Sequence, residues 1–278
     1  MNKTDTLSPI SRSLTYLSSI LYLSVGAALF AAPQWAAVDF AWNVSPFVVM
    51  TIGAWFLGNG AMAFESARDW RWSVTHPTLA YLWAFAIADT AVFISFWDKV
   101  NLGSVSATGY ALALIVGLVT ALVGITEAIT RRPTVRPIGA PVETWVRTGM
   151  ISFLIVTGIL TLGGLLAKQG GLSTEGVLFP EKITVFTVRV FAVFFGALLI
   201  GGIPLIRSQG VAPLYFILRP GLVLIAATLI AALVNLGAFD FAARPLGLGY
   251  FAAYLTTLIF ALVVIQRYRG SAPLNVTA

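Results

Sequence analysis

The sequence predicts an all-α polytopic membrane protein with about eight transmembrane helices, and three observations lead to that prediction. The chain of 278 residues is 58% hydrophobic and only 10% charged, whereas soluble globular domains average about 45–50% and about 25%. Its mean hydropathy is +0.90. Apolar stretches recur that are long enough to cross the hydrocarbon core of a bilayer, which takes about 20 residues. The chain is therefore expected to be embedded in lipid.

The predicted spans are separated by short polar loops, and proline marks most of their starts. The spans are residues 14–32, 46–65, 78–97, 107–128, 145–166, 182–205, 219–238 and 247–266. Proline suits the first helical turn because its missing N–H would have no partner there. The prolines at or near these starts are Pro46, Pro77, Pro141, Pro180, Pro220 and Pro245. The first span is interpreted as a retained helix rather than a signal peptide, because Pro33 stands where cleavage would occur.

The basic residues are unevenly distributed between the two sides of the predicted bundle. Twelve of the 17 lie on the side of the two termini, namely Lys3, Arg12, Arg68, Arg71, Arg131, Arg132, Arg136, Arg147, Arg207, Arg219, Arg267 and Arg269. The other side has Lys99, Lys168, Lys182 and Arg244, and Arg189 lies inside a span. The positive-inside rule therefore predicts cytoplasmic N- and C-termini in a bacterial-type plasma membrane.

Short internal matches indicate that the chain is duplicated. Val-Asn-Leu-Gly stands at the end of the third predicted span, at 100–103, and at the end of the seventh, at 234–237, which gives a sequence offset of 134. A second match, at an offset of 138, brings Phe56-Leu57-Gly58 onto Phe194-Phe195-Gly196. An even number of spans in each unit keeps both units in one orientation, related by an axis along the membrane normal. The predicted units are two parallel four-helix repeats, residues 1–138 and 139–278.

Asp89 and Arg189 are charged residues within predicted spans. A charge at the centre of a membrane helix costs roughly 2.5–3.5 kcal/mol on insertion scales, so each residue needs a compensating partner or a function. Their depths below the same surface are similar when counted along the helices, which makes an Asp89–Arg189 ion pair joining the two halves one hypothesis. Two alternatives stay open. Asp89 is neutral and hydrogen-bonded to a neighbouring helix while Arg189 extends to the headgroups, or Asp89 is a proton or ion site.

Asn59 lies between Gly58 and Gly60 in the second predicted span. The glycines would let another helix backbone approach closely enough to meet the amide, so helix packing is the first interpretation and ligand contact the second. His76, beside Pro77, is expected in a loop on the side of the termini, where it contacts a helix end or a headgroup rather than a metal.

Several function classes are disfavoured by what the sequence lacks. It has no cysteine and one histidine, which leaves no basis for a thiolate or polyhistidine metal site. No nucleophile motif, phosphate-binding glycine loop or HExxH pair occurs, and the predicted loops are far below domain size, so no catalytic residues are assigned and an enzyme is not expected. The positive charge is explained by membrane topology rather than by nucleic-acid binding.

Two function hypotheses remain. The first is a non-catalytic structural or accessory subunit that packs with other membrane subunits, or with itself, and holds lipid, quinone or carotenoid between its helices, since its spans are apolar and carry small-residue packing seams. The alternative is a transporter of a small solute, or a proton-coupled one, that uses the intramembrane Asp89.

Overall fold

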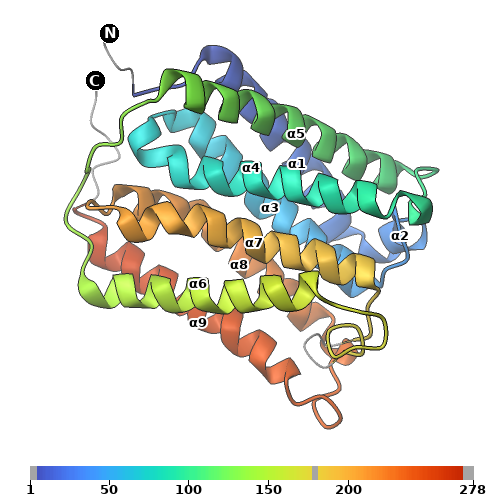
Figure 1. Cartoon of the computed structure of the whole chain (residues 1–278). Coiled ribbons are helices and arrows are strands. Elements are labelled where there is room, and N and C mark those ends of the chain that lie inside the picture. Colours follow the sequence, from blue (N-terminus) through green and yellow to red (C-terminus); the bar gives the residue numbers. More distant parts are fainter. Residues whose placement is uncertain (1–4, 177–180, 272–278) are drawn as a thin grey trace.

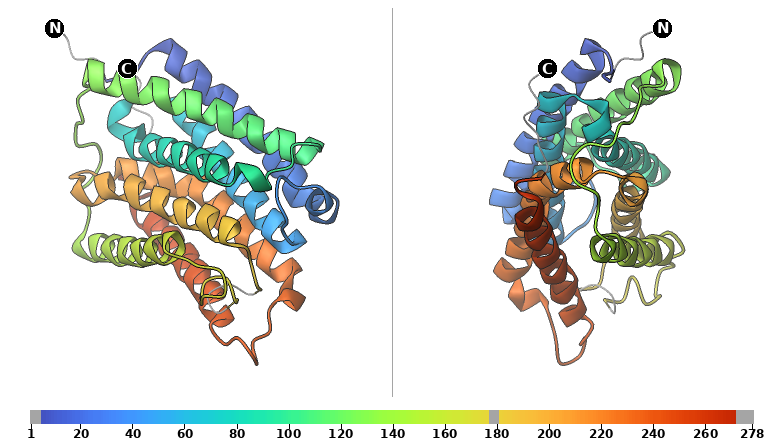
Figure 2. Two further views of the ribbon diagram at one scale, coloured as in Figure 1. Left: turned by 45° about the vertical axis from the view of Figure 1, so that its right-hand side comes forward. Right: turned by 90° about the vertical axis from the view of Figure 1, so that its left-hand side faces the viewer.

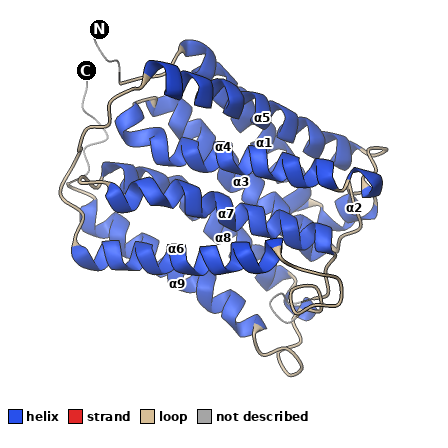
Figure 3. Ribbon diagram, in the orientation of Figure 1, coloured by secondary structure: helices blue, strands red, loops and turns tan. Residues whose placement is uncertain are grey.

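The computed structural model describes residues 5–176 and 181–271, and within them the chain is all-helical (Figures 1 and 3). Eight helices of this described part are long and apolar enough to cross a membrane, which confirms the predicted fold class. They are α1 (Pro9–Ala31), α3 (Pro46–Asp69), α4 (Trp72–Ser95), α5 (Val105–Arg131), α6 (Thr144–Leu165), α7 (Val185–Arg207), α8 (Ala212–Val234) and α9 (Gly247–Tyr268). Shorter helices are α2 (Pro33–Val38), η1 (Trp97–Lys99) and η2 (Leu236–Ala238).

The two ends of the bundle are distinct because successive long helices run in opposite directions. We call the end that holds Asp5, the α3–α4 corner, the linker 132–143 and Ser271 the terminal face, and the opposite end the distal face (Figure 1). Backbone hydrogen bonds tie both ends of the described chain to this face. Trp72 donates to the carbonyl of Asp5 at 2.7 Å, and Ala140 donates to that of Ser271 at 3.1 Å.

The eight long helices stack in two layers of four (Figure 2). One layer has the order α5, α4, α7, α6, and the other has the order α1, α3, α8, α9. Each layer therefore combines two helices from residues 1–138 with two from residues 139–278. The two halves of the chain are interchangeable in this arrangement. If α1, α3, α4 and α5 trade places with α6, α7, α8 and α9, respectively, the order of helices in one layer becomes the order in the other.

The outer ends of the two layers differ. At one end α1 packs along α5, but the counterpart pair α6 and α9 makes at most a weak contact, near Trp145, Gly149 and Phe260. From there α9 diverges from α6 toward the distal face (Figures 1 and 2). The second half of the chain is consequently more open than the first.

The Val-Asn-Leu-Gly tetrapeptides do not occupy equivalent places in the fold. The first copy begins directly after η1, whereas the second begins at the last residue of α8 and runs into η2. The predicted offset of 134 is therefore wrong as a register for these helices. For the one pair α3 and α7, an offset of 138 brings Asp69 at the end of α3 onto Arg207 at the end of α7. It also brings Pro46, the first residue of α3, onto Thr184, the N-cap of α7.

Two prolines expected at helix starts lie inside helices instead. Pro77 is within α4 and Pro220 is within α8, so both helices begin more than a turn earlier than the sequence predicts. His76 accordingly belongs to α4 rather than to a loop, and its Nδ1 lies 2.9 Å from the carbonyl oxygen of Trp72. Lys3, counted among the basic residues on the side of the termini, and Pro180, expected near a helix start, lie outside the described residues.

A tertiary contact explains the early start of α4. The carboxylate of Asp5 accepts hydrogen bonds from the backbone N–H of Ser73 at 3.0 Å and from its hydroxyl at 2.7 Å. It thus satisfies one of the N–H groups that a first helical turn leaves without a partner. Because Asp5 is distant from Ser73 in the sequence, the residues around Pro77 carry no sign of this extra turn.

Candidate functional site

Asp89 forms the polar centre of the intramembrane site. Its side chain projects from α4 and is only 1% exposed. One carboxylate oxygen, Oδ2, accepts a hydrogen bond of 2.7 Å from the hydroxyl of Tyr110 in α5. The other, Oδ1, is buried without a hydrogen-bond partner. Asp89 lies in the last two turns of α4, about 9 Å of helical rise from its end, so it sits nearer the distal face than its expected place at the middle of the span.

The structure does not bring Asp89 and Arg189 together. Within residues 5–176 and 181–271, no ion pair joins them. The guanidinium of Arg189 lies over the ring of Phe96, 5.5 Å from its centroid, near the distal ends of α4 and α7. The ion-pair hypothesis is therefore replaced by a hydrogen bond from Tyr110 to Asp89 and a cation–π contact of Arg189.

Asn59 and its flanking glycines lie where three helices meet α3. The carbonyl oxygen of the Asn59 side chain accepts a hydrogen bond of 2.5 Å from the hydroxyl of Tyr81 in α4. A Cβ built on Gly58 would fall 2.3 Å from the Cβ of Leu224 in α8, and one on Gly60 would fall 2.6 Å from Leu23 in α1. These residues thus take part in close helix packing, although Nδ2 of Asn59 is buried without a partner.

Sequence reasoning missed a row of hydroxyl groups on α1. Its members are Ser8 at the N-cap and Ser11, Thr15, Ser18 and Tyr22 within the helix, each at most 5% exposed. Their spacing of three and four residues places them on one face. The signal was present in the sequence as polar residues at helical spacing within an apolar run. We call this row the hydroxyl column.

Aromatic rings surround Tyr110 toward the distal face. The ring centroids of Phe40 and Trp42, which lie between α2 and α3, are each 5.4 Å from that of Tyr110. The ring of Phe93 is 5.8 Å away. All three side chains are at most 5% exposed. We call Phe40, Trp42 and Phe93 the aromatic cap, because they separate the Asp89–Tyr110 pair from the distal face.

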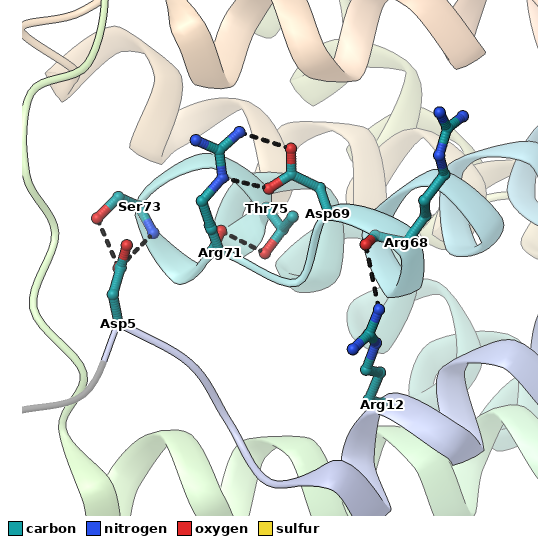
Figure 4. Close-up of polar contacts among 7 residues, drawn as sticks. All are labelled: Asp5, Arg12, Arg68, Asp69, Arg71, Ser73 and Thr75. Carbon is teal, nitrogen blue, oxygen red and sulfur yellow. Dashed lines mark hydrogen bonds and ion pairs between the residues drawn. The ribbon is translucent and has the colours of Figure 1, made fainter. Parts of the chain in front are cut away.

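A second polar cluster holds the N-terminal segment against the α3–α4 corner at the terminal face (Figure 4). Arg71 forms two hydrogen bonds to Asp69, of 2.6 and 2.7 Å, and this contact raises the pKa of Arg71. Arg12 donates to the carbonyls of Ala67 at 2.7 Å and Arg68 at 3.3 Å. A cation at the C-terminal end of a helix is favourable because that end carries partial negative charge.

The contact between Asp5 and α4 can be tested by mutation. Asp5→Ala is expected to lower the free energy of unfolding by about 1 kcal/mol, the usual cost of losing a helix cap. Thermal unfolding in detergent would measure the change. Asp98→Ala, at an exposed position of η1 on the distal face, is the matched control and should leave stability within about 0.5 kcal/mol. Equal effects of the two substitutions would contradict the role of Asp5 as a cap.

The fold and the buried polar site define a class of protein: the chain is a polytopic α-helical membrane protein with an ionisable residue inside its helical bundle. Comparison with known proteins identifies no relative, since no family model matches and neither a curated protein nor a solved structure is significantly similar. Its function must therefore be inferred from its own residues.

Proposed function

We propose that this membrane protein is a non-catalytic subunit that packs against other membrane subunits. The observation that carries the proposal is the weakly covered pair of helices α6 and α9, in which only 22% and 17% of an apolar stretch of 18 residues is buried within the chain. Large exposed side chains cover both helices, namely Ile151, Ile155, Val156, Ile159, Leu162 and Leu165 on α6 and Leu248, Leu255, Ile259, Leu262 and Val263 on α9.

These faces are suited to apolar partners. The side chains named above are aliphatic and offer packing surface, which fits a transmembrane helix of another subunit or of a second copy. A lipid, quinone or carotenoid tail held between such helices would meet the same chemistry. The partially open arrangement of α6 and α9 favours this side of the bundle over the side where α1 and α5 close on each other.

Site-specific cross-linking would test the subunit proposal directly. The natural chain has no cysteine, so Ile159→Cys in α6 and Leu262→Cys in α9 each provide a single attachment point for a photo-cross-linker. Ile115→Cys in α5, which is comparably exposed at 56% against 64% for Ile159, is the matched control. We expect discrete protein adducts from the α6 and α9 positions in native membranes and none from α5.

The intact mass of the complex, purified in mild detergent from the source membrane, supplies a second readout. A stoichiometric assembly is the expected result. A chain that elutes alone as a monomer, with no preferred cross-links from α6 or α9, would overturn the subunit proposal.

We also infer the orientation and the origin of the fold. Placing the terminal face in the cytoplasm of a bacterial-type plasma membrane is supported by the excess of lysine and arginine on that side. We infer a duplication into residues 1–138 and 139–278, related by an axis along the membrane normal. Its support is that interchanging the helices of the two halves turns the helix order of one layer into that of the other. Co-expressed halves should then co-purify, while failure to associate would weigh against two repeat units.

Asp89 favours a second candidate function, a transporter of a small or protonatable solute. A buried carboxylate oxygen without a partner is costly in a membrane, and such residues commonly lie on ion or proton pathways. Asp89→Asn is expected to abolish a proton-dependent flux in proteoliposomes while expression stays normal. Asp98→Asn, in the exposed η1 segment, should leave the flux unchanged. An effect of Asp89→Asn on stability or assembly alone would exclude this function.

A further inference from the structure

The hydroxyl column leads from the terminal face to the neighbourhood of Asp89. It begins at Ser8, whose backbone N–H donates to a carboxylate oxygen of Glu127 at 2.8 Å and whose hydroxyl donates to the other oxygen. Glu127 is partly exposed near the terminal end of α5 and lies 3.9 Å from Arg131. The column therefore starts at an ionisable group that is in contact with solvent.

The middle of the column is lined by hydroxyls from both α1 and α5. The hydroxyls of Ser18 and Thr120 lie 2.8 Å apart. Together with Thr15 and Tyr22 they line a cavity of about 10 Å³, which Leu79, Leu82, Trp83, Ala63 and Gly117 complete. A cavity needs roughly that volume, and two or more polar partners, to hold one water molecule. The structure thus places a space at the lower limit for one water molecule beside Ser18, Thr120 and Tyr22, with hydroxyls on one part of its wall and apolar groups on the rest.

The upper end of the column reaches the carboxylate. The hydroxyl of Tyr22 is buried without a hydrogen-bond partner, as is Oδ1 of Asp89, and Asp89 acts electrostatically on Tyr22. Gly117 makes room for Tyr22, because a Cβ at that position would lie 2.3 Å from the phenol oxygen. Two unsatisfied polar atoms therefore occupy the same part of the core.

We propose that Asp89 is a proton-binding site that exchanges with the terminal face through the hydroxyl column. A proton arrives at Oδ1 while Tyr110 continues to donate to Oδ2. Each hydroxyl or bound water on the route gives one proton to the next group and receives one from the previous group, so only the carboxylate changes its charge. The aromatic cap closes the distal side, which makes the exchange one-sided. The inference deepens the second candidate function but requires only proton binding, not transport.

The charged and titratable groups around Asp89 are consistent with this assignment. Tyr110 of α5 and Tyr22 of α1 face it. From α7, Arg189 is turned to Phe96, and from α8, Arg219 lies over Tyr215. The charged residues of α3 are Glu65, Arg68 and Asp69, toward its end at the terminal face. Within the described part of the chain no cation is paired with the carboxylate.

Infrared spectroscopy of the full chain in lipid nanodiscs would test the proposal. The C=O stretch of a protonated Asp89 should appear as the pH is lowered and should be missing from Asp89→Asn. After transfer to D₂O, the shift of this band reports how quickly the carboxyl exchanges its proton. We expect the double variant Ser18→Ala, Thr120→Val to slow that exchange at least about tenfold, which corresponds to about 1.4 kcal/mol in activation free energy.

Ser19→Ala is the matched control for the double variant. Ser19 lies on the same helix and is equally buried, but its hydroxyl donates to the carbonyl of Gly60 at 2.9 Å and does not line the cavity. It should leave the exchange rate unchanged. Tyr22→Phe keeps the aromatic packing and removes one hydroxyl, so it should also slow exchange and provides a second variant if the double one folds poorly.

Three outcomes would overturn the proposal. The first is the lack of any Asp89-dependent band over the pH range in which the protein stays folded. The second is exchange that neither the double variant nor Tyr22→Phe slows. The third is an exchange rate that responds equally whether the pH is changed on the terminal side or on the distal side of sealed vesicles. If the band and its one-sided exchange are present but no flux is measured, proton binding stands and the transport function alone fails.

Discussion

Replacing Trp55 with alanine is expected to lower the free energy of unfolding by about 3 kcal/mol. Trp55 in α3 is 1% exposed, and its ring stacks on Phe194 in α7 with centroids 3.9 Å apart and planes 3° from parallel. The ring of Phe191 packs against it edge-on at 4.6 Å. Large core aromatics cost about 3–5 kcal/mol when truncated. The lower end applies here because lipid is as apolar as the core, so lost packing is the main cost.

Trp35→Ala provides the control for this prediction. Trp35 lies in α2 and is 57% exposed, so its removal leaves no internal cavity and should change stability by no more than about 0.5 kcal/mol. Thermal or detergent-induced unfolding of both variants, followed by circular dichroism, measures the difference. Because α3 and α7 come from different halves and different layers, a small effect of Trp55→Ala would mean that the aromatic stack does not hold the halves together.

Replacing Gly53 with alanine is expected to destabilise the protein by about 1–3 kcal/mol, the usual cost of overpacking a core. Gly53 of α3 faces Gly26 of α1 where the backbones of the two helices approach each other closely. A Cβ on Gly53 would lie 2.7 Å from the backbone nitrogen of Phe30 and 3.0 Å from the carbonyl oxygen of Gly26. Backbone atoms cannot move aside as a flexible side chain can, so the helices themselves must separate.

Gly163→Ala is the matched substitution. Gly163 lies within α6, and a Cβ there would meet nothing within 4 Å. Alanine should therefore be neutral or stabilising, since it favours helix over glycine by about 1 kcal/mol in water. A loss of stability common to both variants would indicate a general effect of glycine replacement and would contradict the close contact of α1 and α3.

The candidate site was only partly accessible from the sequence. Asp89 stood out because an acidic residue within an apolar run is costly wherever the helix lies. Its partner did not, because Tyr110 is an ordinary aromatic residue whose hydroxyl becomes significant only when α5 packs against α4. Depth along the helices predicts that Arg189 pairs with Asp89, but depth does not specify which direction a side chain faces. Phe96 at the end of α4 is the group that Arg189 meets.

The sequence by itself determined that the chain lies in a membrane, that its long helices are eight in number within the described residues, and that their ends alternate between two faces. The reason is that a span must satisfy its own backbone hydrogen bonds and present apolar side chains. A continuous stretch of about 20 residues meets both requirements by itself. Only the tertiary structure decided the two-layer order, the extra first turn of α4, and the route of hydroxyls to Asp89. Those features arise from contacts between residues far apart in the chain, such as Asp5 with Ser73 and Ser18 with Thr120. In addition, composition does not distinguish apolar residues that face lipid from those that face the core, because the two sets are chemically alike.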